Sequence, residues 1–397
     1  MSKSGSKSRR DVVALHLRDI PRSGIRDFFD IVSARTDVIS LGIGEPDFTT
    51  PWHIREAAMY ALDHGATQYT SNRGLDSLRE AIAGYVRENF GATYDPATEI
   101  LITVGVSQAV DLALRAILNP GDEVLVHEPS YVCYGPLTTL AYGVPVPVVT
   151  GAGDEFRLTR ALLEPKITER TRALVMNFPT NPTGATLSRE DVEGVAALAR
   201  ERDLMVLTDE IYSELTYEGE RFSIASLPGM KERTIFLHGF SKAWAMTGFR
   251  VGYACGPADI IEGMMKIHQY GMLCAPILSQ KAAVEALRND QGDVATMRTS
   301  YQQRRNFLWG ALNEIGIRCH RPKGAFYMFP RIADYGLKSK DFALRLLEEQ
   351  NVACVPGTAF GASGEGFLRC SYATDLDDIK EAVRRMGIFV KTLKRAS

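Results

Sequence analysis

The sequence has no marked excess of charge and no long apolar run. Its 46 Lys and Arg residues stand against 48 Asp and Glu residues, for a formal net charge of −2. A chain that binds nucleic acid or an anionic membrane surface through its overall charge carries a clear positive excess, which is missing here. No apolar stretch approaches the roughly 20 residues that a membrane-spanning helix needs. We therefore expect neither nucleic acid nor a membrane as a partner.

Paired cysteines and linker-like segments are also missing. The six cysteines, at positions 133, 255, 274, 319, 354 and 370, form no CxxC pair, so the sequence indicates no zinc ribbon, no disulfide framework and no metal site. The basic N-terminus MSKSGSKSRR is followed by a segment in which His16, Arg18 and Asp19 interrupt the apolar run of a signal peptide. We expect a cytoplasmic protein.

The 397 residues are 45% hydrophobic and 24% charged, which is ordinary for a globular chain. Because single cores stop growing near about 250–300 residues, two domains are expected. Short β-branched runs alternate with amphipathic helical segments such as 107–118 and 188–202, which predicts an α/β fold with a mostly parallel seven-stranded sheet. The expected strands are 101–104, 124–127, 145–149, 173–178, 205–208, 234–238 and 251–254. Too few residues separate the last two for a helical crossover, so the last strand is expected to pair antiparallel.

The C-terminal part reads as a smaller α+β domain. A long helix through 295–315 precedes short strands at 326–330, 352–355 and 367–371 and helices at 340–350 and 376–392. The N-terminal arm has too little apolar content to form a core alone, so we expect it to join this region. The predicted division is a large domain of residues 46–285 and a small domain of residues 1–45 and 286–397.

Chemically useful side chains follow the predicted strands, at the edge where ligands bind in open α/β sheets. A helix begins after the first strand at Gly105-Val106-Ser107, and its free N–H groups suit a phosphate, to which Ser241 and Arg250 add contacts. The other strand ends supply an aromatic face, an amide, a carboxylate, a phenol and an amine, from Tyr131, Asn181, Asp209, Tyr212 and Lys242. An amine that forms a Schiff base and a carboxylate that keeps a ring nitrogen protonated match the needs of pyridoxal 5′-phosphate.

Longer motifs make the resemblance explicit. They are SLGIGEPDF (40–48), TQYTSNRGLDSLREAI (67–82), NPTG (181–184), DEIY (209–212), SKAWAMTGFRVGY (241–253), PKGAFYMFP (322–330), VPGTAFG (355–361) and LRCSYA (368–373). In order and spacing the sequence resembles the class I/II aminotransferases, which are pyridoxal-phosphate enzymes of fold type I, over residues 11–392. It is most similar to the subgroup that holds prokaryotic aspartate and aromatic aminotransferases.

The resemblance implies a role for each cofactor-site residue. Lys242 is expected to form the Schiff base and to move the proton of the reaction, and Asp209 to pair with the ring nitrogen. Tyr131 takes the stacking position at which many relatives have tryptophan. The remaining expected cofactor contacts are Asn181 and Tyr212 on the ring oxygen and Val106, Ser107, Ser241 and Arg250 on the phosphate.

The resemblance also implies a substrate site and a homodimer. Arg369 is expected to bind the substrate α-carboxylate, with help from Asn181 and the backbone near Gly44. Tyr69 is expected to reach the phosphate in the neighbouring subunit. A distal carboxylate has several candidate partners, namely His268, Gln269 and Tyr270 of the segment KIHQYGMLCAP, Arg26 and Arg73. We expect aspartate and aromatic amino acids as donors and 2-oxoglutarate as acceptor.

Other functions are weighed against this one. A dinucleotide dehydrogenase is disfavoured because Pro46 and Asp47 break a G-x-G-x-x-G pattern at Gly42. A DNA-binding regulator on this body lacks room for a DNA-reading domain. A decarboxylase is disfavoured because an arginine that holds the carboxylate in the ring plane exposes the Cα–H bond instead. A C–S β-lyase remains the alternative, since β-elimination also begins with loss of the Cα proton.

Overall fold

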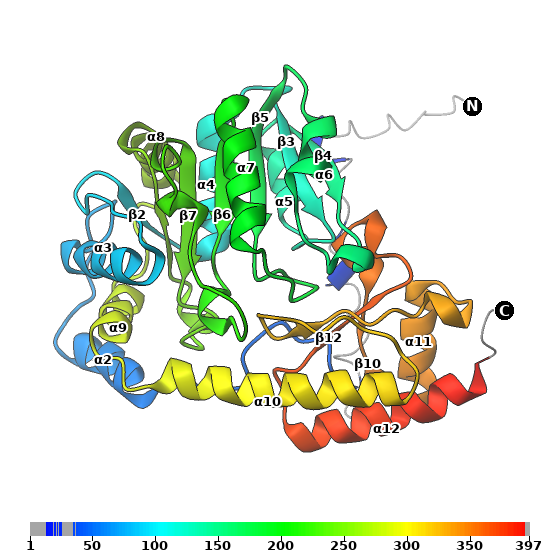
Figure 1. Cartoon of the computed structure of the whole chain (residues 1–397). Helices are drawn as coiled ribbons and strands as arrows, with labels where there is room; N and C mark the ends of the chain where they lie inside the picture. The colour runs from blue at the N-terminus through cyan, green and yellow to red at the C-terminus, as the bar shows by residue number, and fades with distance from the viewer. Residues whose placement is uncertain are drawn as a thin grey trace, which may run out of the picture.

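The structure is a computed structural model that describes residues 13–18, 20, 22, 24–25, 35 and 37–393. Figure 1 shows a large twisted sheet flanked by helices, with a second layer of helices and short strands built from the C-terminal part. Among the residues described, no helix is long and apolar enough to cross a membrane. The cytoplasmic location stays a prediction.

The large sheet has seven strands in the order β2-β8-β7-β6-β5-β3-β4. They are β2 (Ile100–Thr103), β3 (Glu123–Glu128), β4 (Val144–Val149), β5 (Thr171–Asn177), β6 (Met205–Asp209), β7 (Thr234–Gly239) and β8 (Gly252–Cys255). All seven predicted strands are confirmed within a few residues of their expected bounds. Strand β8 runs antiparallel to both β2 and β7, as its short connection from β7 predicts.

Helices cover both faces of this sheet because its strands bury side chains on both faces. In β7, Ile235 and Leu237 pack on the face covered by α4 (Gly105–Ile117), α5 (Tyr134–Leu140) and α8 (Ala258–Gly271), whereas Phe236 points to the opposite face. The helices of that opposite face are α2 (Trp52–Asp63), α3 (Asp76–Phe90), α7 (Arg189–Glu201) and α9 (Ile277–Arg288), and α6 (Arg160–Leu163) lies beside α7. Helix α7 begins at the predicted place because Ser188 and Asp191 form a capping box.

The C-terminal region matches the predicted α+β pattern. Its helices are α10 (Asp293–Glu314), α11 (Ser339–Gln350) and α12 (Leu376–Thr392). Its strands are β9 (Tyr327–Met328), β10 (Val352–Ala353), β11 (Val355–Pro356) and β12 (Leu368–Ser371), of which β11, β12 and β9 form an antiparallel sheet. Figure 1 shows α10 and α12 lying side by side along this region.

The N-terminal segment is tied to this C-terminal region by a short strand. Strand β1 (Ile39–Ser40) pairs parallel with β10, and the Leu41 N–H donates to the Ala353 carbonyl at 2.8 Å. Residues 39–41 therefore lie beside the C-terminal region. The domain boundaries at residues 46 and 285 stay a prediction.

Candidate active site

A cavity of about 630 Å³ lies at the carboxyl ends of β5, β6 and β7. The predicted site residues that line it are Gly44, Val106, Ser107, Tyr131, Asn181, Asp209, Tyr212, Ser241, Lys242, Arg250 and Arg369. The remaining predicted residue, Tyr69, is outside this lining, and its side chain is 82% exposed at the surface. The fold thus gathers eleven residues from scattered motifs into one place.

Lys242 follows strand β7, and its Nζ donates to the carbonyl oxygen of Gly44 at 2.7 Å. Burial lowers the pKa of the Lys242 ammonium to about 8; Glu45 opposes this, while Arg369 adds to the lowering. An amine whose pKa is lowered in this way is neutral, and hence nucleophilic, in a larger fraction of molecules near neutral pH. Lys242 is therefore suited to attack a carbonyl group.

Asp209, the last residue of β6, is a buried carboxylate held by donors. The Tyr134 hydroxyl donates to Oδ2 at 2.7 Å, and the Ile211 N–H donates to Oδ1 at 3.2 Å. Burial raises the pKa of Asp209 although these hydrogen bonds lower it. A buried carboxylate is stabilised by a positive partner, so this end of the cavity suits a cationic ring nitrogen.

Arg369 of β12 reaches the same cavity from the C-terminal region and is 2% exposed. Its guanidinium lies over the rings of Tyr327 and Phe360, with carbon-to-centroid distances of 4.5 and 4.8 Å. Nη1 donates to Asn181 Oδ1 at 3.0 Å and Nη2 to the Gly42 carbonyl at 2.6 Å. Among the residues that the structure describes, Nε has no hydrogen-bond partner. A guanidinium that is held in place and still has unused N–H donors is suited to bind a carboxylate.

The opposite end of the cavity suits a phosphate. Gly105 opens α4 with φ of 75°, and a Cβ there would lie 2.7 Å from Arg250 Nη2. A Cβ on Gly252 would lie 2.8 Å from the backbone N of Val106. The two glycines therefore let Arg250 and strand β8 approach the N-terminus of α4, where free N–H groups and the helix dipole favour an anion.

Besides Tyr134, three tyrosines line the cavity, namely Tyr131, Tyr212 and Tyr327. The hydroxyls of Tyr212 and Tyr327 are hydrogen-bonded at 2.8 Å, and burial raises the pKa of both phenols. Tyr131 lies edge-on to Tyr134 at 5.9 Å between ring centroids. The protonated phenols are donors for a ring oxygen, and Tyr131 offers a face or edge for stacking.

Sequence reasoning missed several residues of this cavity, among them Tyr134, Asn177 and Tyr327. Tyr134 lies three residues after Tyr131, and Asn177 is the last residue of a buried strand. The rule that ligands bind at strand ends could have singled out Asn177. Tyr327 lies within the quoted motif PKGAFYMFP, but the motif alone does not say which of its aromatic residues faces the cavity.

The candidates for binding a distal carboxylate are placed as follows. His268 is fully buried within its own chain, and burial lowers its pKa. Tyr270 is 89% exposed. Arg73 pairs with Glu262 and donates to the Thr98 carbonyl at 3.3 Å. Arg26 lies outside the described residues.

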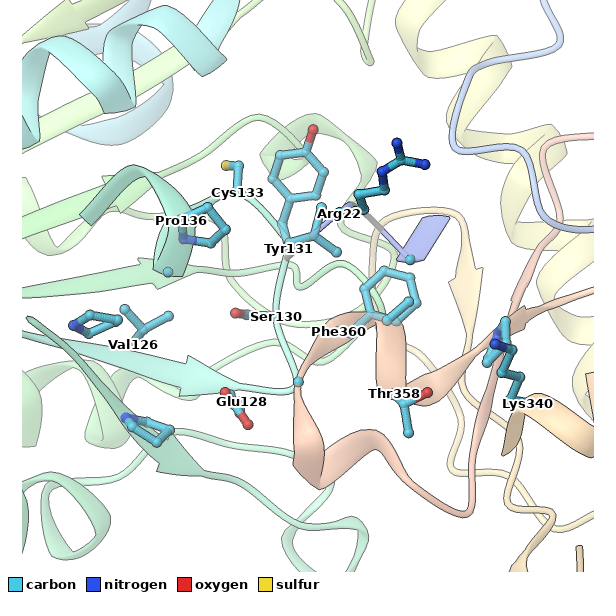
Figure 2. A pocket seen from close by; sticks show the side chains of 18 of the residues that line it. Arg22, Val126, Glu128, Ser130, Tyr131, Cys133, Pro136, Lys340, Thr358 and Phe360 are labelled. Atoms are coloured by element: carbon cyan, nitrogen blue, oxygen red, sulfur yellow. The ribbon is translucent and has the colours of Figure 1, made fainter. Parts of the chain in front are cut away.

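A second cavity of about 700 Å³ adjoins the first, and the two share Tyr131, Val132 and Cys133 in their walls. In Figure 2, Glu128, Ser130 and Tyr131 form one side of this second cavity, and Thr358 and Phe360 lie across from them. Phe360 therefore borders the second cavity and also packs on Arg369, so the space lies next to the carboxylate-binding group.

Comparisons with known proteins agree with this geometry. The family model described as aminotransferase class I and II matches residues 36–386. An aspartate aminotransferase of Pyrococcus abyssi is 48% identical, over 92% of this chain and 94% of its own. Aromatic-amino-acid aminotransferase 2 of Thermococcus litoralis is 47% identical, over 94% of this chain and 96% of its own.

Solved structures show the same likeness. The crystal structure of an aromatic aminotransferase from Pyrococcus horikoshii matches with a TM-score of 0.88 and 47% identity, over 93% of this chain and 99% of that chain. The match spans the large sheet and the C-terminal region alike, so the arrangement of both parts is that of the solved protein.

Proposed function

Because this chain belongs to the class I and II aminotransferases, we propose that it holds pyridoxal 5′-phosphate in the cavity around Lys242. It would use this cofactor to exchange amino groups between an L-amino acid and a 2-oxo acid. The observation that carries the proposal is the conjunction of a lysine whose pKa is about 8 with a buried aspartate and a buried arginine in one cavity.

The residues present fit this cofactor. Gly105 leaves the space that Arg250 needs beside the N-terminus of α4, which suits the phosphate group. Asp209 would pair with the ring nitrogen, Tyr212 and Asn181 would donate to the ring oxygen, and Tyr131 would stack on the ring. When bound, the cofactor supplies an electron-accepting ring that makes the Cα–H bond of an attached amino acid acidic.

The chain's own groups would then divide the work. Arg369 binds the α-carboxylate of the amino acid with its guanidinium, oriented by Asn181 and the Gly42 carbonyl. Lys242 Nζ would be the amine that takes up the Cα proton and gives it back. An arginine that fixes the carboxylate favours loss of this proton over loss of carbon dioxide.

The donors we propose are aspartate and aromatic amino acids, with 2-oxoglutarate as the acceptor. The relatives named above include an aspartate and an aromatic aminotransferase. The second cavity beside Tyr131 and Phe360 offers room that a short dicarboxylate does not need, which supports acceptance of an aromatic ring. Its apolar wall includes Pro136, Pro145, Pro147 and Leu344.

We also propose that the enzyme works as a homodimer in which Tyr69 reaches the partner's phosphate site. Large apolar side chains are exposed on and near α2 and at the end of α8: Trp52, Met59, Tyr60, Leu62, Tyr69, Tyr270 and Met272. Such a gathering of exposed apolar surface is typical of an interface. A phenol 82% exposed in the single chain is free to contact a second copy.

The test is an absorbance spectrum of the protein loaded with cofactor, recorded as aspartate, tyrosine, phenylalanine, alanine and cystathionine are added in turn. We expect the visible band of the lysine-bound cofactor to be lost as the amino form of the cofactor accumulates, most readily with the preferred donors. A band that persists while pyruvate and ammonia accumulate from cystathionine would instead indicate a β-lyase. No visible band after cofactor addition would contradict the proposal as a whole.

A further inference from the structure

One buried amide, Asn177, touches both functional ends of the candidate active site. It is the last residue of β5, is 1% exposed, and lies beside Asp209 in the parallel pairing of β5 with β6. Its side-chain Nδ2 donates to the Asp209 carbonyl at 2.8 Å. Its Oδ1 accepts from the Asn181 N–H at 3.2 Å.

Each of these two partners holds a different functional group. The Asp209 side chain is the carboxylate that suits a cationic ring nitrogen, and Asn177 bonds the backbone carbonyl of Asp209. The Asn181 side chain accepts from Arg369 Nη1 at 3.0 Å, and its backbone is what Asn177 holds. A single amide thus connects the backbone of the carboxylate to the backbone of the residue that orients the arginine.

The orientation of this amide is determined by its surroundings. The Asp209 carbonyl needs a donor and the Asn181 N–H needs an acceptor. If the side-chain amide of Asn177 were flipped, its NH2 group and its oxygen would change places and both hydrogen bonds would be lost. The backbone of Asn177 is fixed as well, because its N–H donates to His127 Nε2 at 3.3 Å and its carbonyl accepts from Thr180 Oγ1 at 2.6 Å. Burial lowers the pKa of His127 to about 4, so the imidazole is neutral and can accept.

We propose that Asn177 is a positioning residue that sets the ring-nitrogen partner Asp209 and the carboxylate clamp of Asn181 and Arg369 relative to each other. This inference rests on the proposed function and goes beyond it, because it assigns a role to a residue that touches neither the phosphate nor the substrate carboxylate. An ordinary strand-end amide would contribute to stability alone.

Two variants separate the two contacts. Asn177→Ala removes both hydrogen bonds, whereas Asn177→Asp keeps an acceptor for the Asn181 N–H but loses the donor to the Asp209 carbonyl. Ser339→Ala is the matched control, because Ser339 is also fully buried and also has two hydrogen-bonded neighbours, donating to Glu365 and accepting from the Gly366 N–H. It lies outside both cavity linings.

The first measurement is the affinity of the cofactor-free protein for pyridoxal 5′-phosphate, by absorbance titration. The second is the affinity of the loaded protein for a carboxylate analogue that lacks the amino group, by calorimetry. Because one buried hydrogen bond corresponds to about tenfold in affinity, Asn177→Ala should weaken both about tenfold. Asn177→Asp should weaken cofactor binding by at least about tenfold and change analogue binding by less than about threefold. Ser339→Ala should lower the melting temperature and change neither affinity.

The outcomes distinguish this inference from the proposed function. A wild-type chain that does not bind the cofactor would overturn the proposed function and this inference with it. A wild type that binds, with variants that lose thermal stability but keep both affinities, would overturn this inference alone. Equal losses of both affinities in Asn177→Asp and Asn177→Ala would contradict the separation of the two contacts. The near-isosteric aspartate keeps the test available if the alanine variant does not fold.

Discussion

The cofactor end of the cavity and its carboxylate end are assembled in different ways. Asp209 is held by Tyr134 and Asn177, whose hydrogen bonds come from elements of the same large sheet and the helix beside it. Arg369 stands on a strand of the C-terminal region, and its contacts reach Asn181 and Gly42, which are 188 and 327 positions away in the chain. One end is therefore internal to a sheet, and the other depends on how three separate segments pack.

This difference predicts which substitutions affect only one end of the cavity. A change at Arg369 should alter substrate binding and leave cofactor binding intact, because the guanidinium takes no part in the hydrogen bonds of Asp209. A change at Tyr134 should do the reverse. The predictions below test this separation, beginning with the group that serves both ends.

The largest effect is expected for Lys242→Ala. Loss of the amine removes the bond to the cofactor and the group that moves the proton, for which general acid–base contributions are about 10²–10⁴-fold. We expect kcat to fall by at least about a thousandfold in a coupled assay, with the visible band of the lysine-bound cofactor absent. The control is Lys323→Ala, which removes an exposed lysine paired with Glu155. Near-normal turnover in Lys242→Ala would refute the assignment of the lysine.

The next effect in size is expected for Arg369→Ala. Charge-assisted hydrogen bonds of about 1.5–3 kcal/mol correspond to a rise in KM of about tenfold to a hundredfold for every amino-acid donor. The dissociation constant of the cofactor should stay within about twofold of the wild-type value. Arg331→Ala, at an arginine that pairs with Asp334 outside both cavity linings, is the control. Release of the cofactor from Arg369→Ala would contradict the idea that the cofactor end and the carboxylate end respond separately to substitution.

A smaller effect is expected for Tyr134→Phe. The variant loses the hydroxyl that donates to Asp209 at 2.7 Å, so the carboxyl pKa should rise further and the cofactor affinity should fall about threefold to tenfold. The KM for donors should be nearly unchanged. Tyr335→Phe serves as control, since that hydroxyl donates to the Gly316 carbonyl in the C-terminal region. An unchanged cofactor affinity would show that the Tyr134 hydroxyl does not contribute to cofactor binding.

The smallest effect concerns stability and pH in the cofactor-free protein. The folded-state pKa of Lys242, about 8, lies below its ordinary value of 10.5, so the unfolded chain binds more protons between these two pH values. The free energy of unfolding should therefore rise with pH in this window, by at most about 1.4 kcal/mol per pH unit. Denaturant melts of wild type and Lys242→Ala at pH 8, 9 and 10, chosen as roughly spanning this window, should show the free energy of unfolding of the wild type rising relative to that of the variant. A constant difference would mean that Lys242 is not destabilised by burial.

Much of the cofactor end could be predicted from the sequence because its residues directly follow strands. The runs that became β5, β6 and β7 are apolar and β-branched, and their pairing brings Asn181, Asp209 and Lys242 to one edge. The antiparallel pairing of β8 was predicted because the connection between β7 and β8 is too short for a helical crossover. These are local signals, and the structure agrees with them.

The carboxylate end was less accessible to sequence reasoning. Arg369 was identified through a resemblance, but its contacts with the Tyr327 and Phe360 rings depend on packing across the C-terminal region. At the cofactor end, the contact of Tyr134 with Asp209 was not predicted either, because it depends on where α5 begins relative to β6, which no local pattern specifies. The burial of His268 depends on neighbours from other elements, which no local pattern specifies.

The β1–β10 pairing has a consequence for insertions and deletions. It fixes Ile39 and Ser40 against Val352 and Ala353, and four residues after Ser40 the carbonyl of Gly44 accepts from Lys242 at 2.7 Å. One inserted residue in an extended segment adds about 3.3 Å, enough to move that carbonyl out of reach. We therefore expect length changes between Ser40 and Gly44 to be poorly tolerated, because this short segment sets the distance from the C-terminal region to the reactive amine.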